Sequence, residues 1–104
     1  MFVNLTVQSF PSENEMELSI MRWDAVKDKY MNRFAELGLE RYTCTRVWNK
    51  VEKFQLAYVF EYKDEQAMKN CLPLWKEIEQ EFQEKITNMT VAYRGIVIDQ
   101  YDFT

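Results

Sequence analysis

Apolar and polar residues alternate at the start of the chain. Val3, Leu5 and Val7 are apolar, and the residues between them, Asn4 and Thr6, are polar. In a strand, successive side chains point to opposite faces of the sheet, so a period of two is typical of this element. The pattern therefore predicts an N-terminal strand with one apolar and one polar face.

The period then changes to three and four residues, which is typical of a helix. Ser12 with Glu15 three residues later forms a capping-box pattern, which favours a helix start. Gly38 favours a helix end, because glycine readily adopts the left-handed conformation found there. Between these signals the apolar residues form one stripe: Met16, Ile20, Trp23, Val26, Tyr30, Phe34 and Leu37. A first helix is therefore predicted between Ser12 and Gly38.

Two segments rich in β-branched and aromatic residues follow, at 41–48 and 54–62, with a polar segment between them. This composition is typical of strands, so the two segments predict an antiparallel hairpin. In the second segment, large side chains occupy both alternating sets of positions. Both faces of the sheet are therefore expected to be covered.

A second helical pattern begins at Asp64, a residue type that favours the N-cap. Pro73 interrupts it, and proline is tolerated best in the first turn of a helix. Proline also restricts the backbone of the preceding residue, Leu72. The sequence therefore predicts a short helix from Asp64 to Cys71 and a redirected helical piece from Pro73 to about Thr87.

The closing segment, 89–103, has the pattern of a long last strand, with a bulge or bend expected at Gly95. Its end, Asp99 to Phe103, is expected to extend past its own sheet. The order strand, helix, strand, strand, helix, strand predicts an α+β fold of the ferredoxin-like type. In this fold a four-stranded antiparallel sheet carries both helices on one face. Residues 1–104 are expected to form a single such domain.

Composition excludes several classes of chemistry and partner. Thirteen basic and seventeen acidic residues give a net charge of −4, so neither nucleic acid nor an anionic membrane surface is an expected partner. The sequence has no histidine, which excludes Ser-His-Asp triads, Cys-His dyads and His-ligated metals. The two cysteines are too few for a zinc cage and too far apart for a CxxC motif. We therefore expect neither a metal nor a cofactor.

The N-terminal residues lack the basic segment and long apolar run of a signal peptide, so the expected location is the cytoplasm. Two helices can cover only one face of the predicted sheet, and an exposed aromatic patch usually marks an interface or a ligand groove. The aromatic residues expected on the uncovered face are Tyr42, Trp48, Phe54, Tyr58 and Tyr93. We expect a homodimer that forms sheet to sheet, with the C-terminal strand paired along the partner's sheet edge. A tail packed on its own domain is the alternative.

With this order of elements, the stretch FQLAYVFEYKDEQAMKNCLPLWKEIEQEF resembles the dimeric α/β-barrel superfamily, which includes the antibiotic-biosynthesis-monooxygenase-like proteins. The features that carry the resemblance are an apolar strand ending in Tyr62, the helix opening KDEQAM, the pair Leu72 and Pro73, and the aromatic Trp75. The resemblance implies two ferredoxin-like subunits joined through their sheets. It also implies a small cavity between the sheet and the helices of each subunit.

Members of this superfamily include haem-degrading enzymes and cofactor-free oxygenases that act on aromatic polyketides. Asn4 matches the first-strand Asn of the haem-degrading branch, but Cys71 stands where its Trp would fall and no histidine is present, so we reject that scheme. The oxygenase branch uses Asn, Trp, Tyr and Arg around a phenolic substrate. Residues of these types here are Asn4, Arg46, Trp48, Tyr58, Trp75, Tyr93 and Arg94.

The candidate ligand pocket comprises Asn4, Arg46, Trp48, Tyr58, Cys71, Trp75 and Tyr93. Structural alternatives are an exposed polar side chain for Asn4, a salt bridge across the dimer for Arg46, and a buried, unreactive thiol for Cys71. No catalytic residue is assigned. Two functions are open: a dimer that binds a small, partly aromatic ligand without catalysis, or a cofactor-independent monooxygenase-like enzyme acting on a phenolic or polyketide-like substrate.

Overall fold

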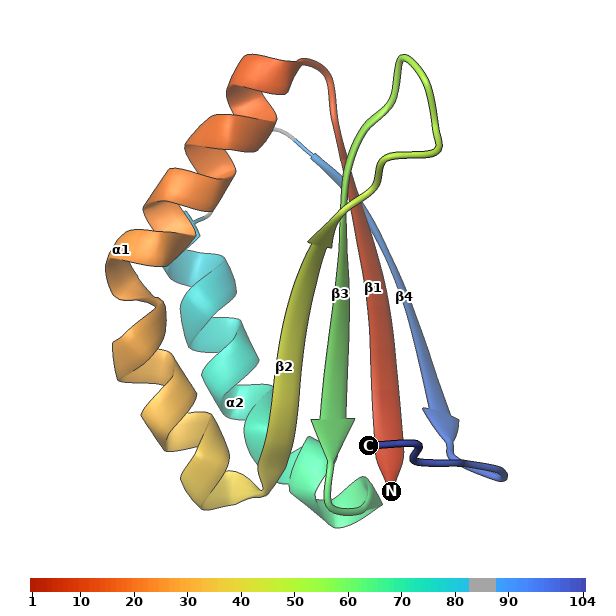
Figure 1. The fold of residues 1–104 in the computed structure, drawn as a ribbon. Coiled ribbons are helices and arrows are strands. Elements are labelled where there is room, and N and C mark those ends of the chain that lie inside the picture. Colours follow the sequence, from red (N-terminus) through yellow and green to blue (C-terminus); the bar gives the residue numbers. More distant parts are fainter. Residues whose placement is uncertain (83–87) are drawn as a thin grey trace.

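The computed structural model describes residues 1–82 and 88–104 and has the predicted order of elements (Figure 1). The elements are β1 (Phe2–Phe10), α1 (Glu13–Leu37), β2 (Leu39–Arg46), β3 (Phe54–Tyr62), α2 (Glu65–Phe82) and β4 (Met89–Ile96). The strands form one antiparallel sheet in the order β2-β3-β1-β4. Both helices lie against the same face of this sheet (Figure 1). The chain therefore has the predicted ferredoxin-like fold.

The predicted signals at the helix ends are confirmed. The backbone N–H of Glu15 donates to Ser12 Oγ at 3.2 Å, which caps the start of α1. Gly38 ends this helix in the left-handed conformation with φ 108°. Asp64 Oδ1 accepts a hydrogen bond from the N–H of Ala67 at 2.8 Å, so the start of α2 is capped as well.

Gly38 also lies against the first turn of α2, where a Cβ atom on residue 38 would stand 2.5 Å from the Cβ of Ala67. We expect Gly38→Ala to lower the free energy of unfolding by about 2–4 kcal/mol, because left-handed backbone strain adds to a steric overlap. Urea unfolding measures the loss. The double variant Gly38→Ala/Ala67→Gly removes the overlap and should recover part of the stability lost. Unchanged stability of Gly38→Ala would contradict this description of the turn.

The second helix differs from its prediction. Helix α2 is continuous and contains Pro73 in its interior, so the predicted division at Leu72 is not observed. Buried side chains on both sides of the proline attach the helix to the core: Ala67, Met68, Cys71, Leu74 and Ile78. This packing offsets the loss of one backbone hydrogen bond at the proline. The predicted helix end near Thr87 lies outside the described residues.

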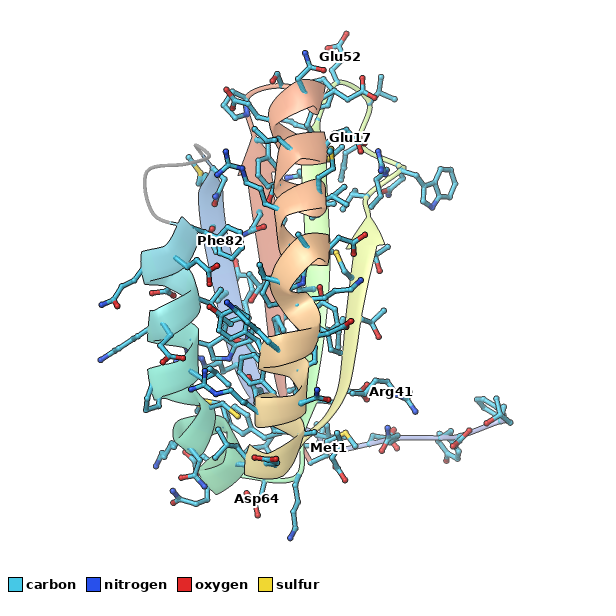
Figure 2. All side chains as sticks on the ribbon, turned by 90° about the vertical axis from the view of Figure 1, so that its left-hand side faces the viewer. Met1, Glu17, Arg41, Glu52, Asp64 and Phe82 are labelled. Carbon is cyan, nitrogen blue, oxygen red and sulfur yellow. The ribbon has the colours of Figure 1, made fainter. Side chains whose placement is uncertain are left out.

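The last strand is shorter and more regular than predicted. Strand β4 ends at Ile96, and Gly95 pairs opposite Val3 in an unbroken register, so the bulge expected at this glycine is not observed. Residues 97–104 continue outside the sheet as a tail that projects from the body of the molecule (Figure 2). Three large apolar side chains of the tail are exposed: Ile98, Tyr101 and Phe103.

The two faces of the sheet carry different side chains. Even-numbered residues of β1 and β3 face the helices, where Phe10, Leu56 and Phe60 belong to the buried core. Odd-numbered residues project from the opposite side, which no helix covers (Figure 1). We call this side the open face, and its apolar residues are Val3, Leu5, Val7, Ala57, Val59, Met89, Val91 and Tyr93.

The predicted set of aromatic residues on the uncovered face is largely wrong. Tyr42 and Tyr58 face the helices, because their side chains belong to the alternating set that packs against the core. Phe54 packs beside Phe10 and Leu56 on the same side. Trp48 lies in the β2–β3 loop. Among the aromatic residues named for that face, only Tyr93 lies there, and aliphatic residues surround it.

Candidate functional site

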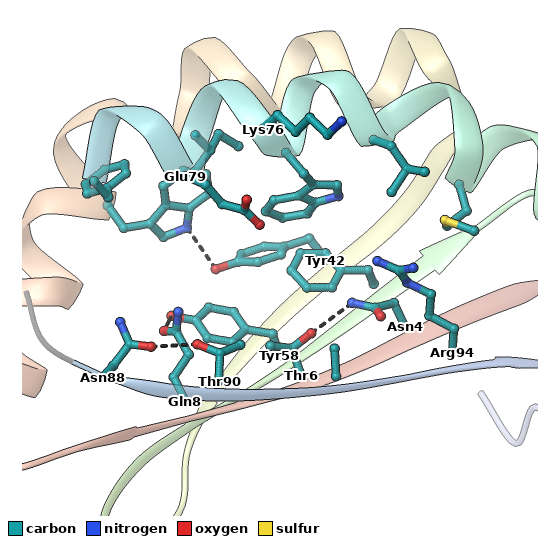
Figure 3. Close-up of a pocket in the computed structure, with 18 of the residues that line it drawn as sticks. Asn4, Thr6, Gln8, Tyr42, Tyr58, Lys76, Glu79, Asn88, Thr90 and Arg94 are labelled. Atoms are coloured by element: carbon teal, nitrogen blue, oxygen red, sulfur yellow. Dashed lines mark hydrogen bonds between the residues drawn. The ribbon is translucent and has the colours of Figure 1, made fainter. Parts of the chain in front are cut away.

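A cavity of about 650 Å³ lies between the two helices and the sheet (Figure 3). Its volume falls within the range typical of pockets for small molecules, about 300–1,000 Å³. Strands β1 and β4 form most of its floor, and α2 forms its roof. Aromatic side chains from α1, β2 and β3 complete the walls.

The floor of the cavity is polar. The register of β1 with β4 places Asn4 opposite Arg94, Thr6 opposite Ala92, and Gln8 opposite Thr90, and all six side chains line the cavity. The predicted alternation of the first strand is thus confirmed, but its polar side faces the helices and its apolar side is the open face. Polar groups on the inner side of a sheet are expected where they border a cavity instead of a packed core.

The roof of the cavity consists of residues from one side of α2: Met68, Leu72, Trp75, Lys76, Ile78, Glu79 and Phe82. Trp75 Nε1 donates to the Tyr62 hydroxyl at 2.9 Å. Trp23 of α1 donates in the same way to the Tyr42 hydroxyl, also at 2.9 Å. These two hydrogen bonds fix the orientation of both indole rings between the helices and the sheet.

The tyrosines of the cavity remain protonated at neutral pH. Burial raises the pKa of Tyr42 and of Tyr58 well above the ordinary value for a phenol, and raises the pKa of Tyr62 to about 12. The Tyr58 hydroxyl donates to Gln8 Oε1 at 2.9 Å. These hydroxyls can therefore orient a ligand by hydrogen bonds, but they are not general bases at neutral pH.

The raised pKa values predict a loss of stability in alkaline solution. In the unfolded chain a phenol ionises near pH 10, whereas the buried tyrosines stay neutral. Their contribution to folding is complete below about pH 10 and is lost as the pH rises toward the folded-state values, about 12 for Tyr62. The urea midpoint should therefore fall steadily above about pH 10. Tyr58→Phe, with one fewer buried phenol, should show a shallower fall, and a midpoint independent of pH in this range would contradict the assignment.

Asn4 carries the unsatisfied polar atom of the cavity floor. Its side chain is only 9% exposed, and its Nδ2 donates to Thr6 Oγ1 at 2.8 Å. Its Oδ1 is buried and has no hydrogen-bond partner in the described part of the chain. Leaving such an acceptor unpaired costs about 1–3 kcal/mol. Arg94, opposite Asn4 in the register, makes no ion pair within residues 1–82 and 88–104.

Three of the seven predicted pocket residues line the cavity: Asn4, Tyr58 and Trp75. The other four do not. Cys71 is fully buried in the core beside the cavity, and burial raises its pKa to about 11, as expected for an unreactive thiol. Arg46 forms an ion pair with Glu17 of α1, within its own chain. Trp48 is 89% exposed in its loop, and Tyr93 projects from the open face.

The cavity also contains residues that were not predicted from the sequence. Thr6 and Gln8 share the alternation of Asn4, and this could have placed them in the same set. Glu79 was not predicted either, because it lies beside Ile78 of the apolar stripe of α2 and the sequence pattern does not distinguish it from the other glutamates of the helix.

Among the described residues, no group of three or more Cys, Asp or Glu side chains is placed to hold a metal ion. None of the helices in these ranges combines the length and apolar character needed to cross a bilayer.

The model of one protein family matches residues 1–97 of this chain: the domain of unknown function DUF6974. The chain belongs to the DUF6974 family. No functionally curated protein matches it. A dimeric ferredoxin-like protein from an uncultured marine organism superposes on this DUF6974 chain with a TM-score of 0.86 and 29% identity, over 98% of this chain and 99% of that chain. A second dimeric ferredoxin-like protein, also from an uncultured marine organism, superposes with a TM-score of 0.82 and 23% identity, over 96% of this chain and 97% of that chain.

The DUF6974 chain is also similar to a monooxygenase from the gene ActVA-Orf6 of Streptomyces coelicolor, solved in complex with the ligand nanaomycin D. The TM-score is 0.62 and the identity 12%, over 95% of this chain and 92% of that chain. At this identity the similarity concerns the fold alone. Together the three structures confirm the predicted resemblance to dimeric ferredoxin-like proteins and to monooxygenases of this fold.

Proposed function

We propose that this protein binds a small, partly aromatic compound in the cavity between α2 and the sheet. One observation carries the proposal: Asn4, whose Oδ1 is a buried acceptor without a donor in the described residues, lines a cavity of about 650 Å³ together with several aromatic rings. A ligand hydroxyl that donates to this oxygen would remove the cost of the unpaired acceptor.

The aromatic and the polar residues that line the cavity indicate the chemical class of the ligand. Flat aromatic rings suit the space beside Trp23, Trp75 and Tyr58, because aromatic side chains prefer stacked or edge-on contacts with other rings. Arg94 beside Asn4 favours a polar edge with acidic oxygen atoms, such as a phenol or an enol. The monooxygenase of similar fold that was solved with nanaomycin D supports the same class of phenolic or polyketide-like compound.

Cofactor-independent monooxygenation is the second candidate function, and the fold shared with the ActVA-Orf6 monooxygenase favours it. In that reaction Asn4 and Arg94 would stabilise an anion of the bound substrate. The high pKa of the buried tyrosines leaves them unable to abstract a proton at neutral pH, so binding without catalysis is the simpler proposal. Oxygen uptake with each compound that binds separates the two functions.

We also infer that the protein forms a homodimer through its open face. Leu5, Val91 and Tyr93 are 48%, 42% and 66% exposed in the isolated chain. A contiguous apolar patch of this kind usually marks an interface, and two of the similar structures are dimeric. The tail, residues 97–104, would pair along the partner's sheet edge, which would bury its three exposed apolar side chains.

Titration of the protein with naphthalene-2,6-diol and other phenolic compounds tests the binding proposal. A ligand that binds the folded state alone raises the melting temperature by mass action, and isothermal titration calorimetry then gives its Kd. We expect a saturable rise in melting temperature with flat phenols and no rise with aliphatic alcohols of similar size. No response to any phenolic compound would contradict the proposal.

A further inference from the structure

One carboxylate lies beside the apolar stripe that α2 turns toward the cavity. Met68, Leu72, Trp75, Ile78 and Phe82 recur at intervals of three or four residues and line the cavity. Glu79 follows Ile78, and its side chain is exposed in the isolated chain yet lines the same cavity. A carboxylate therefore borders the cavity from its roof.

The Glu79 side chain extends from α2 toward the sheet, into the cavity (Figure 3). Within the described ranges it makes no hydrogen bond and no ion pair. The other glutamates of α2 do make ion pairs: Glu65 with Lys69, Glu77 with Arg33, and Glu81 with Lys29. Glu79 therefore differs from its neighbours both in its direction and in its lack of a partner among these residues.

We propose that Glu79 is a specificity-determining residue that accepts a hydrogen bond from a second donor group of the ligand, a hydroxyl or an ammonium. This inference rests on the proposed function and adds the chemistry of the cavity roof, which α2 forms. Asn4 and Arg94 recognise one polar edge of the ligand from the sheet, and Glu79 recognises another edge from α2. The preferred ligand is thus a flat aromatic compound with polar groups on two edges, of which the one that meets Glu79 is a donor.

The aromatic surroundings strengthen this contact. Trp23 and Trp75 line the same cavity as the carboxylate and exclude part of the solvent around a bound ligand. A hydrogen bond to an ionised acceptor is shorter and stronger than one between neutral groups, and a weakly polar environment strengthens it further. Glu79 therefore discriminates between a ligand that presents a donor and one of the same shape that does not.

Two matched ligands test the inference: naphthalene-2,6-diol and its monomethyl ether, which lacks one of the two donors. Calorimetric titration compares the wild-type protein with Glu79→Gln, which removes the charge at nearly constant shape. Glu36→Gln is the control, because Glu36 is an exposed carboxylate outside the cavity. Thermal melting verifies that each variant is folded.

The wild-type protein should bind the diol about tenfold or more tightly than the ether, because a hydrogen bond to a charged group is lost with the methyl group. In Glu79→Gln this preference should fall to about twofold, and the Kd of the ether should be nearly unchanged. Glu36→Gln should behave as the wild type. A preference for the diol that survives in Glu79→Gln overturns the inference and leaves the proposed function intact, whereas failure of both ligands to bind the wild type overturns both.

Discussion

The variant Ala92→Phe is expected to lose binding of aromatic ligands, with an affinity for naphthalene-2,6-diol at least about a hundredfold weaker than that of the wild type. Ala92 lies on the cavity floor opposite Thr6, and its side chain faces α2. A phenyl ring at this position would occupy the space in which the ligand ring stacks. Because the ring would enter the cavity without displacing packed side chains, the free energy of unfolding should change by less than about 1 kcal/mol.

Ala25→Phe is the matched control for this experiment. Ala25 is exposed on α1, outside the cavity, so the same substitution there should leave the Kd unchanged. Calorimetric titration of both variants measures the difference. Wild-type affinity in a folded Ala92→Phe variant would mean that the ligand binds elsewhere on the molecule.

The variant Leu5→Glu is expected to be monomeric at concentrations at which the wild-type protein is dimeric. Leu5 lies near the middle of the open face, opposite Val59 of β3 and Tyr93 of β4. In a two-fold dimer formed through this face, each subunit contributes the same patch. Two unpaired carboxylates would then enter an apolar interface, and burial of an unpaired charge is costly enough to weaken the dimer by about a hundredfold or more.

Analytical ultracentrifugation at micromolar concentration measures this change. Met21→Glu is the control, because Met21 is 67% exposed on α1, away from the open face, and its replacement should leave the dimer intact. Leu5→Glu should retain the wild-type circular dichroism spectrum, since its side chain does not contribute to the core of the chain. A monomeric wild-type protein, or a dimeric Leu5→Glu variant, would contradict the proposed interface.

The element order and the helix ends were predictable because their signals act over short distances in the sequence. Ser12 caps α1 through a residue three positions away, and Asp64 caps α2 in the same way. Gly38 ends α1 through its own backbone conformation. The period of the apolar residues distinguishes helices from strands, and the order of the elements limits the possible topologies.

Each strand has two alternating sets of side chains. Which of the two sets faces the helices was not predictable from such short-range signals. Alternation in β1 separates Asn4 from Leu5, but it does not state which set faces the helices. The apolar set would ordinarily face them, and here it lies on the open face while the polar set borders a cavity. For the same reason Tyr42 and Tyr58 were expected on the uncovered face, although they line the cavity.

Which residues belong to the site depends on contacts between distant parts of the chain. Arg46 is of a suitable type for a ligand pocket, but it meets Glu17, which lies 29 residues away. Trp48 falls in a loop whose direction the sequence does not determine. The break expected at Pro73 is absent, because packing of α2 on the core outweighs a local preference. Residue type alone therefore predicted some residues of the site, but it could not exclude residues of the same types that lie elsewhere.

A crystal structure of the protein with naphthalene-2,6-diol tests the central claim most directly. The claim is that the cavity between α2 and the sheet binds a small aromatic compound. The predicted result is a naphthalene ring between α2 and the β1–β4 floor, with one hydroxyl within hydrogen-bond distance of Asn4 Oδ1. A ring bound only on the open face or on the tail, with side chains closed over the cavity, would contradict the claim.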